Sequence, residues 1–150
     1  MRQWYRASFH WIVRLVVMAL LCTQLVACTT AGAAGEATAS VTVEALSTQL
    51  DQGHALLLLD VRSPEEYADG HIPGARNIHF RDIPDRLEAI GELAENADTI
   101  VIYCERGVRA TKAEKALIAA GFSNVIQLTG HMKAWRDAAF PIDKAPDSAL

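Results

Sequence analysis

The sequence predicts an α/β domain with a mainly parallel β-sheet, and three observations support this. Residues 55–59 and 99–103 are continuous apolar runs, which are typical of strands covered on both faces. Stretches with apolar residues at helical spacing alternate with these runs along the chain. The length of 150 residues suits a single domain. Alternating strands and helices are the pattern of a parallel sheet with helices against it.

Start and stop signals separate the elements expected in the first half of the domain. We expect a strand at 41–43, a helix from 43 to 52, a strand at 55–59, a helix at 64–69 and a brief strand at 76–80. Gly53 stops the first helix. Residues 63–66 form a capping box with Pro64 at the first helical position, and Gly70 ends the helix that they start.

The second half continues this alternation. We expect a helix marked by Ile83, Leu87 and Ile90, a strand at 99–103, a helix at 109–120, a strand at 124–128 and a helix at 131–138. Gly121 is the expected cap at the end of the middle helix. The folded domain therefore spans residues 40–143, and residues 144–150 form a C-terminal tail.

Composition and charge narrow the class of protein. The chain is 51% hydrophobic and 21% charged, which excludes a disordered chain. Its 14 basic and 18 acidic residues are unevenly spread, because the only charged residues before Glu36 are three arginines. From Cys28 onward, eleven basic residues stand against eighteen acidic ones. We therefore expect no nucleic-acid partner, which would require a basic surface.

The first segment has the order of a secretory signal peptide. Basic residues at positions 2, 6 and 14 precede an apolar stretch at 15–22, and Leu-Val-Ala-Cys follows at 25–28. These last four residues resemble the bacterial lipobox, in which the cysteine is acylated and becomes the mature N-terminus. We expect a signal peptide at 1–27 and membrane attachment through lipidated Cys28, since several acyl chains anchor stably. The alternative is an uncleaved membrane helix, for which residues 15–28 are short.

Residues 28–39 are small and nearly uncharged, so we expect a flexible tether between the lipid and the domain. Lipidation implies an exported protein on the periplasmic side of the membrane. Thr29 stands where an aspartate would resemble an inner-membrane retention signal, which favours the outer membrane in a Gram-negative cell. A helix at residues 6–27 would be removed by cleavage and would carry no function.

Cys104 directly follows the strand at 99–103 and is the main candidate for chemistry. The signal peptide removes Cys22 and lipid occupies Cys28, so Cys104 has no intramolecular disulfide partner. The residues after it lead directly into a helix, whose N-terminal N–H groups should point toward the sulfur. This field favours the thiolate over the thiol. The alternative is an inert buried cysteine at a strand end.

The charged residues that follow Cys104 have opposite effects on the ionisation of its thiol. Arg106 and Arg109 favour the thiolate further, whereas Glu105 opposes them. Gly107 lets the backbone curl tightly around the sulfur. Because Arg109 opens the helix, its side chain should be better ordered than that of Arg106, which lies in mid-loop.

Four segments of the folded region form an ordered series of motifs. They are residues 59–67 (Leu-Asp-Val-Arg-Ser-Pro-Glu-Glu-Tyr), 70–78 (Gly-His-Ile-Pro-Gly-Ala-Arg-Asn-Ile), 102–110 (Ile-Tyr-Cys-Glu-Arg-Gly-Val-Arg-Ala) and 128–135 (Leu-Thr-Gly-His-Met-Lys-Ala-Trp). Together they resemble the rhodanese-like domain family over about residues 40–143. One position departs from the family, which usually has a glycine where this chain has His131.

The resemblance implies a five-stranded, mainly parallel sheet with helices on both faces. It also implies that Cys104 is the nucleophile and that the loop after it cradles an anion; its substrate-binding residues are Glu105, Arg106, Gly107, Val108 and Arg109. The six positions from Cys104 to Arg109 resemble sulfurtransferases, whereas phosphatases of the superfold have one more. The implied reaction moves sulfane sulfur from thiosulfate or a similar anionic donor to a thiol or cyanide, through a Cys104 persulfide.

Two other functions use the same cysteine. One is a phosphatase or arsenate reductase, and the other is a persulfide carrier or binding module with little turnover, presented at the membrane to a protein partner. No cofactor or metal is expected, because the histidines of the domain lack ligand spacing with cysteine. These histidines are His54, His71, His79 and His131.

The remaining polar and aromatic residues of the motifs have structural interpretations. Asp60 and Arg62 should be structural rather than catalytic, since a carboxylate at a strand end more often satisfies local N–H groups or pairs with a nearby arginine. His71 should be a hydrogen-bonded residue of a turn rather than a general base. Tyr103 and Trp135 should pack in the core or at its rim.

His131 has two interpretations. In a parallel sheet the loops after Asp60, Cys104 and Leu128 leave from one edge, so His131 should border the mouth above Cys104. An imidazole there attracts an anionic donor when it is protonated, or gives a proton to the leaving group. The alternative is a solvent-facing residue at a helix N-terminus, where the helix dipole disfavours the imidazolium form.

Overall fold

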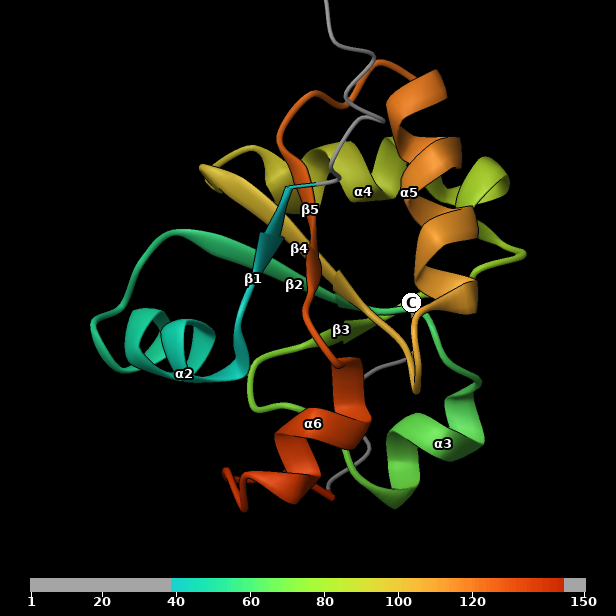
Figure 1. Cartoon of the computed structure of the whole chain (residues 1–150). Coiled ribbons are helices and arrows are strands. Elements are labelled where there is room, and N and C mark those ends of the chain that lie inside the picture. The colour runs from blue at the N-terminus through green and yellow to red at the C-terminus, as the bar shows by residue number, and fades with distance from the viewer. Residues whose placement is uncertain (1–38, 145–150) are drawn as a thin grey trace, which may run out of the picture. The chain divides into compact units, whose positions relative to one another are not determined.

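The computed structural model describes residues 39–144 (Figure 1). The predictions for the signal peptide at 1–27, the helix at 6–27, lipidated Cys28 and the residues from 145 onward lie outside this range. The same holds for the tether at 28–39, apart from its last residue. Within the described range, no helix is both long enough and apolar enough to cross a membrane.

A five-stranded sheet forms the centre of the domain, in the order β1-β5-β4-β2-β3. The strands are β1 (Ser40–Val41), β2 (Leu56–Asp60), β3 (Arg76–Asn77), β4 (Thr99–Tyr103) and β5 (Val125–Leu128). Every neighbouring pair is parallel. The predicted fold class is therefore confirmed.

Helices cover both faces of this sheet (Figure 1). They are α2 (Val43–Asp51), α3 (Pro64–Asp69), α4 (Leu87–Ala94), α5 (Val108–Ala119) and α6 (His131–Asp137), with a 3-10 turn η2 (Ile83–Arg86) before α4. α4 and α5 contribute to the core on one face. α2, α3 and α6 contribute to the core on the other.

Alternation along the central strands builds the two cores. In β4, Ile100 and Ile102 join α4 and α5, whereas Val101 and Tyr103 point to the opposite face and join α2 and α6. All four side chains are fully buried. Burial of one such aliphatic side chain contributes about 1.5–3 kcal/mol, so the apolar run that predicted the strand also holds the sheet between its helices.

Three elements differ from the prediction in their winding or by more than one residue at an end. β1 ends at Val41 because the side chain of Thr42 accepts a hydrogen bond from the Ala45 N–H at 3.2 Å and begins α2. β3 ends at Asn77. The helix expected from Ile83 starts as a 3-10 turn, in which the N–H of Asp85 donates to the carbonyl of Asp82 three residues earlier.

The carboxyl ends of β2, β4 and β5 meet at one edge of the sheet, because the three strands are parallel. Asp60, the last residue of β2, is in register with Tyr103, the last residue of β4. The loops after these strands therefore start side by side, and the loop after Leu128 leaves from the same edge.

Candidate active site

Cys104 lies where β4 meets the loop before α5. Its residue is 1% exposed and forms no disulfide. The backbone N–H of Gly107 donates a hydrogen bond to its sulfur at 3.0 Å. One of the N–H groups expected to point at the sulfur therefore does so, and it comes from the residue that caps α5. A donor in this position stabilises negative charge on the sulfur.

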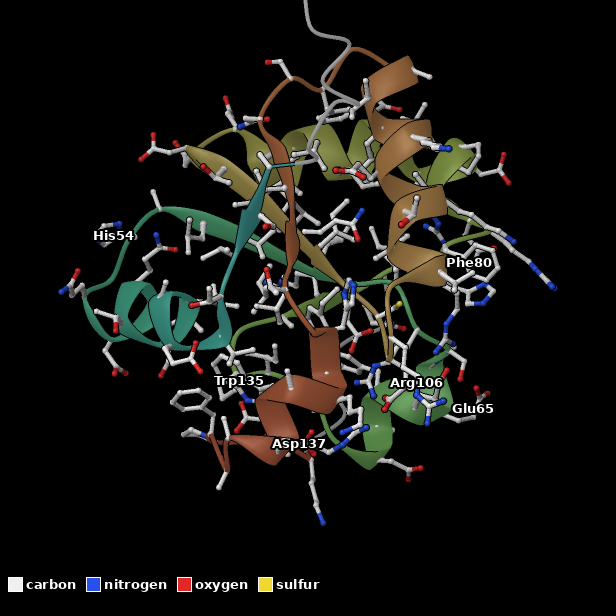
Figure 2. The ribbon with its side chains drawn as sticks, in the orientation of Figure 1. His54, Glu65, Phe80, Arg106, Trp135 and Asp137 are labelled. Atoms are coloured by element: carbon white, nitrogen blue, oxygen red, sulfur yellow. The ribbon has the colours of Figure 1, made fainter. Side chains whose placement is uncertain are left out.

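A cavity of about 240 Å³ opens at the sulfur. Its lining residues are Cys104, Glu105, Arg106, Val108 and Arg109. The sequence named all of these as nucleophile or substrate-binding residues. Arg106 is exposed on the loop (Figure 2), and among the described residues it has no ion-pair partner. The arrangement leaves a free cation at the entrance to a buried thiol.

Gly107 is held in a conformation and a space that suit only glycine. Its φ is +110°, in the region where side chains are strained. A Cβ atom at this position would lie 2.7 Å from His131 Nε2. The imidazole of His131 therefore packs directly against the loop whose N–H holds the Cys104 sulfur.

His131 is buried, so the prediction of a solvent-facing residue is wrong. It is 8% exposed, and its φ of +57° explains why a glycine would suit this position. Burial lowers the pKa of His131 below its usual 6.5. Within the described part of the chain, its Nδ1 has no hydrogen-bond partner. The ring borders the loop after Cys104, and desolvation there disfavours its charged form.

The first turn of α6 also holds the backbone of the loop. The N–H of Met132 donates to the carbonyl of Cys104 at 3.0 Å, and the N–H of Lys133 donates to the carbonyl of Glu105 at 3.3 Å. These carbonyls follow the end of β4, where the sheet ladder no longer supplies them with partners. The position of Cys104 thus depends on a helix that begins 27 residues later in the chain.

Arg109 is ordered by a residue that the sequence did not place in the site. Its guanidinium donates two hydrogen bonds to the carboxylate of Glu66, at 2.5 and 2.8 Å. The hydrogen bonds to Glu66 are the main reason that the pKa of Arg109 is raised, and the nearby Cys104 sulfur adds to this. The hydrogen bonds from Arg109 also lower the pKa of Glu66 from 4.5 to about 2.

Glu66 also caps a helix, as its position three residues after Ser63 predicts. It completes the capping box of α3, in which its side chain accepts from the N–H of Ser63 at 3.1 Å. The contact with Arg109 spans 43 positions of sequence, so no local pattern predicts it. One carboxylate therefore links the start of α3 to the start of α5.

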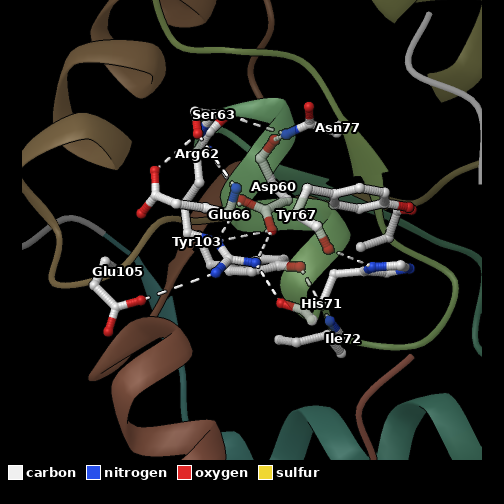
Figure 3. Close-up of polar contacts among 12 residues, drawn as sticks. Asp60, Arg62, Ser63, Glu66, Tyr67, His71, Ile72, Asn77, Tyr103 and Glu105 are labelled. Atoms are coloured by element: carbon white, nitrogen blue, oxygen red, sulfur yellow. Dashed lines mark hydrogen bonds and ion pairs between the residues drawn. The ribbon is translucent and has the colours of Figure 1, made fainter. Parts of the chain in front are cut away.

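Glu105 is also tied to other charges. It forms an ion pair with Arg136 of α6, and its second oxygen lies 3.9 Å from Nη1 of Arg62 (Figure 3). Sequence reasoning missed Arg136, which lies 31 positions away on another helix. Because Glu105 is engaged in this way, its charge is partly balanced rather than directed at the cavity alone.

Asp60 and Arg62 form a buried ion pair, as their structural interpretation predicted. They are 0% and 2% exposed, and the shortest of their contacts joins Nη2 to Oδ2 at 2.6 Å (Figure 3). The Asp60 carboxylate also accepts from the Arg62 N–H at 2.9 Å. Burial alone would lower the pKa of Arg62, but the hydrogen bonds and charge of Asp60 outweigh it and raise the pKa.

The other motif residues are structural as well. His71 is buried, stacks on the Tyr67 ring at 3.7 Å and lies 2.9 Å from the Tyr67 carbonyl. A carbonyl can only accept, so Nδ1 carries the proton. Tyr103 and Trp135 are fully buried in one core, and burial raises the pKa of Tyr103 well above its usual value.

Among residues 39–144, no group of three or more histidine, cysteine or acidic side chains is arranged to hold a metal ion. The polar groups at the sheet edge instead form two kinds of contact. Asp60, Arg62, Glu105 and Arg136 form one chain of charges. The thiol, one N–H and two arginines surround the cavity.

Comparison with known proteins assigns the family. Residues 42–138 match the rhodanese-like domain. The chain belongs to the rhodanese-like domain family. It is 34% identical over 108 residues to thiosulfate sulfurtransferase 16, a chloroplastic protein of Arabidopsis thaliana, and the match covers 63% of this chain and 90% of that protein. It is 36% identical over 99 residues to a sulfurtransferase of Allochromatium vinosum, covering 66% and 89% respectively.

Solved structures give the same result. The human single-domain sulfurtransferase TSTD1 superposes on this rhodanese-like domain with a TM-score of 0.56 and 29% sequence identity. The superposition covers 65% of this chain and 95% of the human protein. The rhodanese-like chain thus has sulfurtransferase relatives by sequence and by fold, which supports sulfur transfer in general.

Proposed function

We propose that this rhodanese-like protein is a sulfurtransferase that works through a persulfide on Cys104. The donor is thiosulfate or a similar anion, and the acceptor is a thiol or cyanide. The observation that carries this proposal is the 3.0 Å hydrogen bond from the Gly107 N–H to the Cys104 sulfur, at a cavity lined by two arginines. A thiolate held in this way is the nucleophile that the reaction needs.

The reaction has two displacement steps. The Cys104 thiolate attacks the outer sulfur of thiosulfate, a new S–S bond forms, and sulfite leaves with the electron pair of the broken bond. The acceptor then attacks the outer sulfur of the persulfide, and the Cys104 thiolate is regenerated. Arg106 and Arg109 favour an anionic donor and the departing sulfite.

The charges around the cavity explain why an anionic donor needs these two arginines. The domain has an acidic excess, which repels anions from most of its surface. Arg106 stands unpaired at the entrance, and Arg109 is fixed by Glu66. The mouth of the cavity therefore gives an anion a local positive field.

The short loop supports sulfur transfer over phosphate chemistry. The loop from Cys104 to Arg109 spans six positions, and α5 begins at Val108 within it. The cavity of about 240 Å³ accommodates a persulfide and a small donor. A phosphatase or arsenate reductase uses the same cysteine and is the function to test against.

A thiosulfate:cyanide assay on residues 29–150, with Cys104→Ser as the control, tests the proposal. We expect repeated turnover to thiocyanate, loss of that turnover in the variant, and addition of one sulfur atom to Cys104 in the mass spectrum when cyanide is left out. Hydrolysis of p-nitrophenyl phosphate without thiocyanate formation would assign the site to a phosphatase. A single round of persulfide loading without turnover would identify a carrier or binding module.

We also propose that the protein is exported and anchored by lipid on Cys28, on the periplasmic side and at the outer membrane in a Gram-negative cell. The lipobox-like residues 25–28 and the position of Thr29 support this. Globomycin should block processing of the precursor, and Cys28→Ser should abolish labelling by radioactive palmitate. Unchanged processing in globomycin would overturn the lipoprotein assignment.

A further inference from the structure

The solvent-facing side of α5 carries an unusual set of residues. Side chains spaced three or four positions apart form this side, which we call the outer face of α5. Its residues are Val108, Thr111, Lys112, Lys115, Ile118 and Ala119, and all are exposed. Val108 is 71% exposed and Ile118 is 55% exposed, and they are the exposed large hydrophobic residues of the described range.

Charge on α5 is divided between its two sides. The acidic residue of this helix, Glu114, is 4% exposed and accepts a hydrogen bond from the Gln127 amide at 2.7 Å. Lys112 and Lys115 point outward instead. In a domain with an acidic excess, the outer face of α5 is therefore positive, with an aliphatic residue at each end.

A neighbouring aromatic residue extends this surface. Phe80 lies beside α5 (Figure 2), and the Lys112 ammonium sits 5.6 Å from the centre of its ring. The guanidinium of Arg81 lies 5.4 Å from the same ring. The two cations flank a partly buried aromatic, an arrangement that orders them without neutralising their charge.

The outer face of α5 runs into the mouth of the active site. Val108 belongs to this face and also lines the cavity that contains the Cys104 sulfur. Arg106, exposed at the same mouth, continues the positive charge. A molecule held along the outer face of α5 would thus have its end next to the nucleophile.

We propose that the outer face of α5 docks an acidic protein segment that carries the cysteine accepting sulfur from Cys104. This inference rests on the proposed sulfurtransferase function. The acceptor thiolate attacks the outer sulfur of the Cys104 persulfide, and a new S–S bond forms. The bond between the two persulfide sulfurs of Cys104 breaks, its electron pair stays on the Cys104 thiolate, and no oxidant is consumed.

The observations favour a protein acceptor over the other molecules that a basic, partly apolar helix can bind. A lipid surface would cover the cavity that Val108 lines, and lipid headgroups offer no thiol. In a two-fold dimer formed through this face, the positive α5 of a second copy would face the positive α5 of the first, and the like charges would repel each other. An acidic chain matches the lysines by charge, and its apolar side chains match Val108 and Ile118.

Two synthetic peptides serve as probes with the full chain purified in detergent. One has a single cysteine, glutamates spaced to face Lys112 and Lys115, and leucines spaced to face the two aliphatic ends. The other is identical except that lysines replace the glutamates. Cys104 is first loaded with sulfur from thiosulfate. At low salt, we then expect sulfur transfer to the acidic peptide to be at least about tenfold faster than transfer to the lysine peptide. Added salt should slow the transfer to the acidic peptide.

Matched variants locate the docking site. Lys115→Glu should slow transfer to the acidic peptide by about tenfold, whereas Arg86→Glu, the same charge reversal on exposed η2, should leave it unchanged. Ile118→Ser should slow transfer through weaker peptide binding. Turnover with cyanide should be equal in all three variants and the parent chain, because none of these residues lines the cavity.

Four results would overturn this inference. The first is equal transfer to both peptides, and the second is an equal effect of Lys115→Glu and Arg86→Glu. The third is binding of phosphatidylserine vesicles that Lys115→Glu abolishes, which would identify a lipid surface. The fourth is a dimer in sedimentation that Ile118→Ser dissociates. Failure of thiosulfate to load Cys104 would instead contradict the proposed sulfurtransferase function. Turnover with cyanide distinguishes the two failures, because it continues when only the docking inference is wrong and is absent when the sulfurtransferase function is wrong.

Discussion

The turns after β2 and β4 start at paired residues, Asp60 and Tyr103, and both are rich in polar groups. After β2, the Arg62 guanidinium donates hydrogen bonds to the Asp60 carboxylate and to the Gly70 carbonyl. After β4, the Cys104 sulfur accepts one backbone hydrogen bond and opens onto a cavity. Two turns at the same edge thus differ in how many of their polar groups are already satisfied.

This difference suits the turn after β2 to stabilising the fold and the turn after β4 to binding and reaction. In the buried ion pair, the Asp60 carboxylate holds Nε and Nη2 of Arg62, and removing one member leaves an uncompensated buried charge. A sulfur with one donor and an adjacent cavity can bind and react. The family motif includes both turns, so a sequence motif alone does not identify which of them reacts.

The largest expected effect is on the β2 turn. Arg62→Met should lower the free energy of unfolding by about 3–5 kcal/mol, because it leaves the buried Asp60 carboxylate without its partner. Urea denaturation measures this. The double variant Asp60→Leu, Arg62→Met should recover most of the loss, and Cys104→Ser should cost less than Arg62→Met, because it leaves no buried charge unpaired. A comparable loss in Arg62→Met and Cys104→Ser would erase the distinction.

The two arginines of the β4 turn should differ in their effect on catalysis. Arg109→Ala should lower kcat/KM for thiosulfate by about ten- to a hundredfold, which corresponds to the loss of a charged hydrogen bond. Arg106→Ala should have a smaller effect, because its exposed side chain is not held by a carboxylate as Arg109 is held by Glu66. Equal losses in the two variants would contradict this order.

The pH dependence of stability should report on His131. Its folded-state pKa is lowered, so the unfolded chain binds its proton first, and stability declines as the pH falls below about 6.5. The slope from this group reaches at most about 1.4 kcal/mol per pH unit. His131→Gly should remove that slope in urea denaturation between pH 5 and pH 8. An equal slope in the variant would show that the imidazole titrates normally.

The activity of the same variant distinguishes positioning from proton transfer. Because His131 packs against Gly107 and is desolvated, we expect His131→Gly to lower kcat/KM for thiosulfate several-fold at every pH. The shape of the profile between pH 5 and pH 8 should not change. A change of shape would indicate that the imidazole exchanges a proton with the substrate.

The smallest expected effect concerns Glu66. Its folded-state pKa of about 2 lies below its usual 4.5, so its contribution to stability is present above pH 4.5 and lost as the pH falls toward 2. The carboxylate is partly exposed, and solvent screening limits the contribution to less than about 1 kcal/mol. Thermal unfolding of Glu66→Gln should accordingly match the parent at pH 2 and fall slightly below it at pH 6.

The sequence by itself determined the elements and the place of the candidate nucleophile Cys104 between a strand and a helix. Apolar runs predicted β2 and β4, and the capping box predicted the start of α3 at Pro64. The position of Cys104 between a buried strand and a helix predicted a thiol near backbone N–H groups, one of which it meets. These inferences succeeded because strands, caps and helix starts depend on residues within about four positions of each other.

Only the tertiary structure decided which side chains surround Cys104 and its loop. The imidazole of His131 against Gly107, the carboxylate of Glu66 on Arg109 and the guanidinium of Arg136 on Glu105 each join residues far apart in the chain. Such contacts depend on how α3 and α6 are placed against the edge of the sheet. That placement follows from the register of the strands and the packing of two cores, which no local pattern encodes.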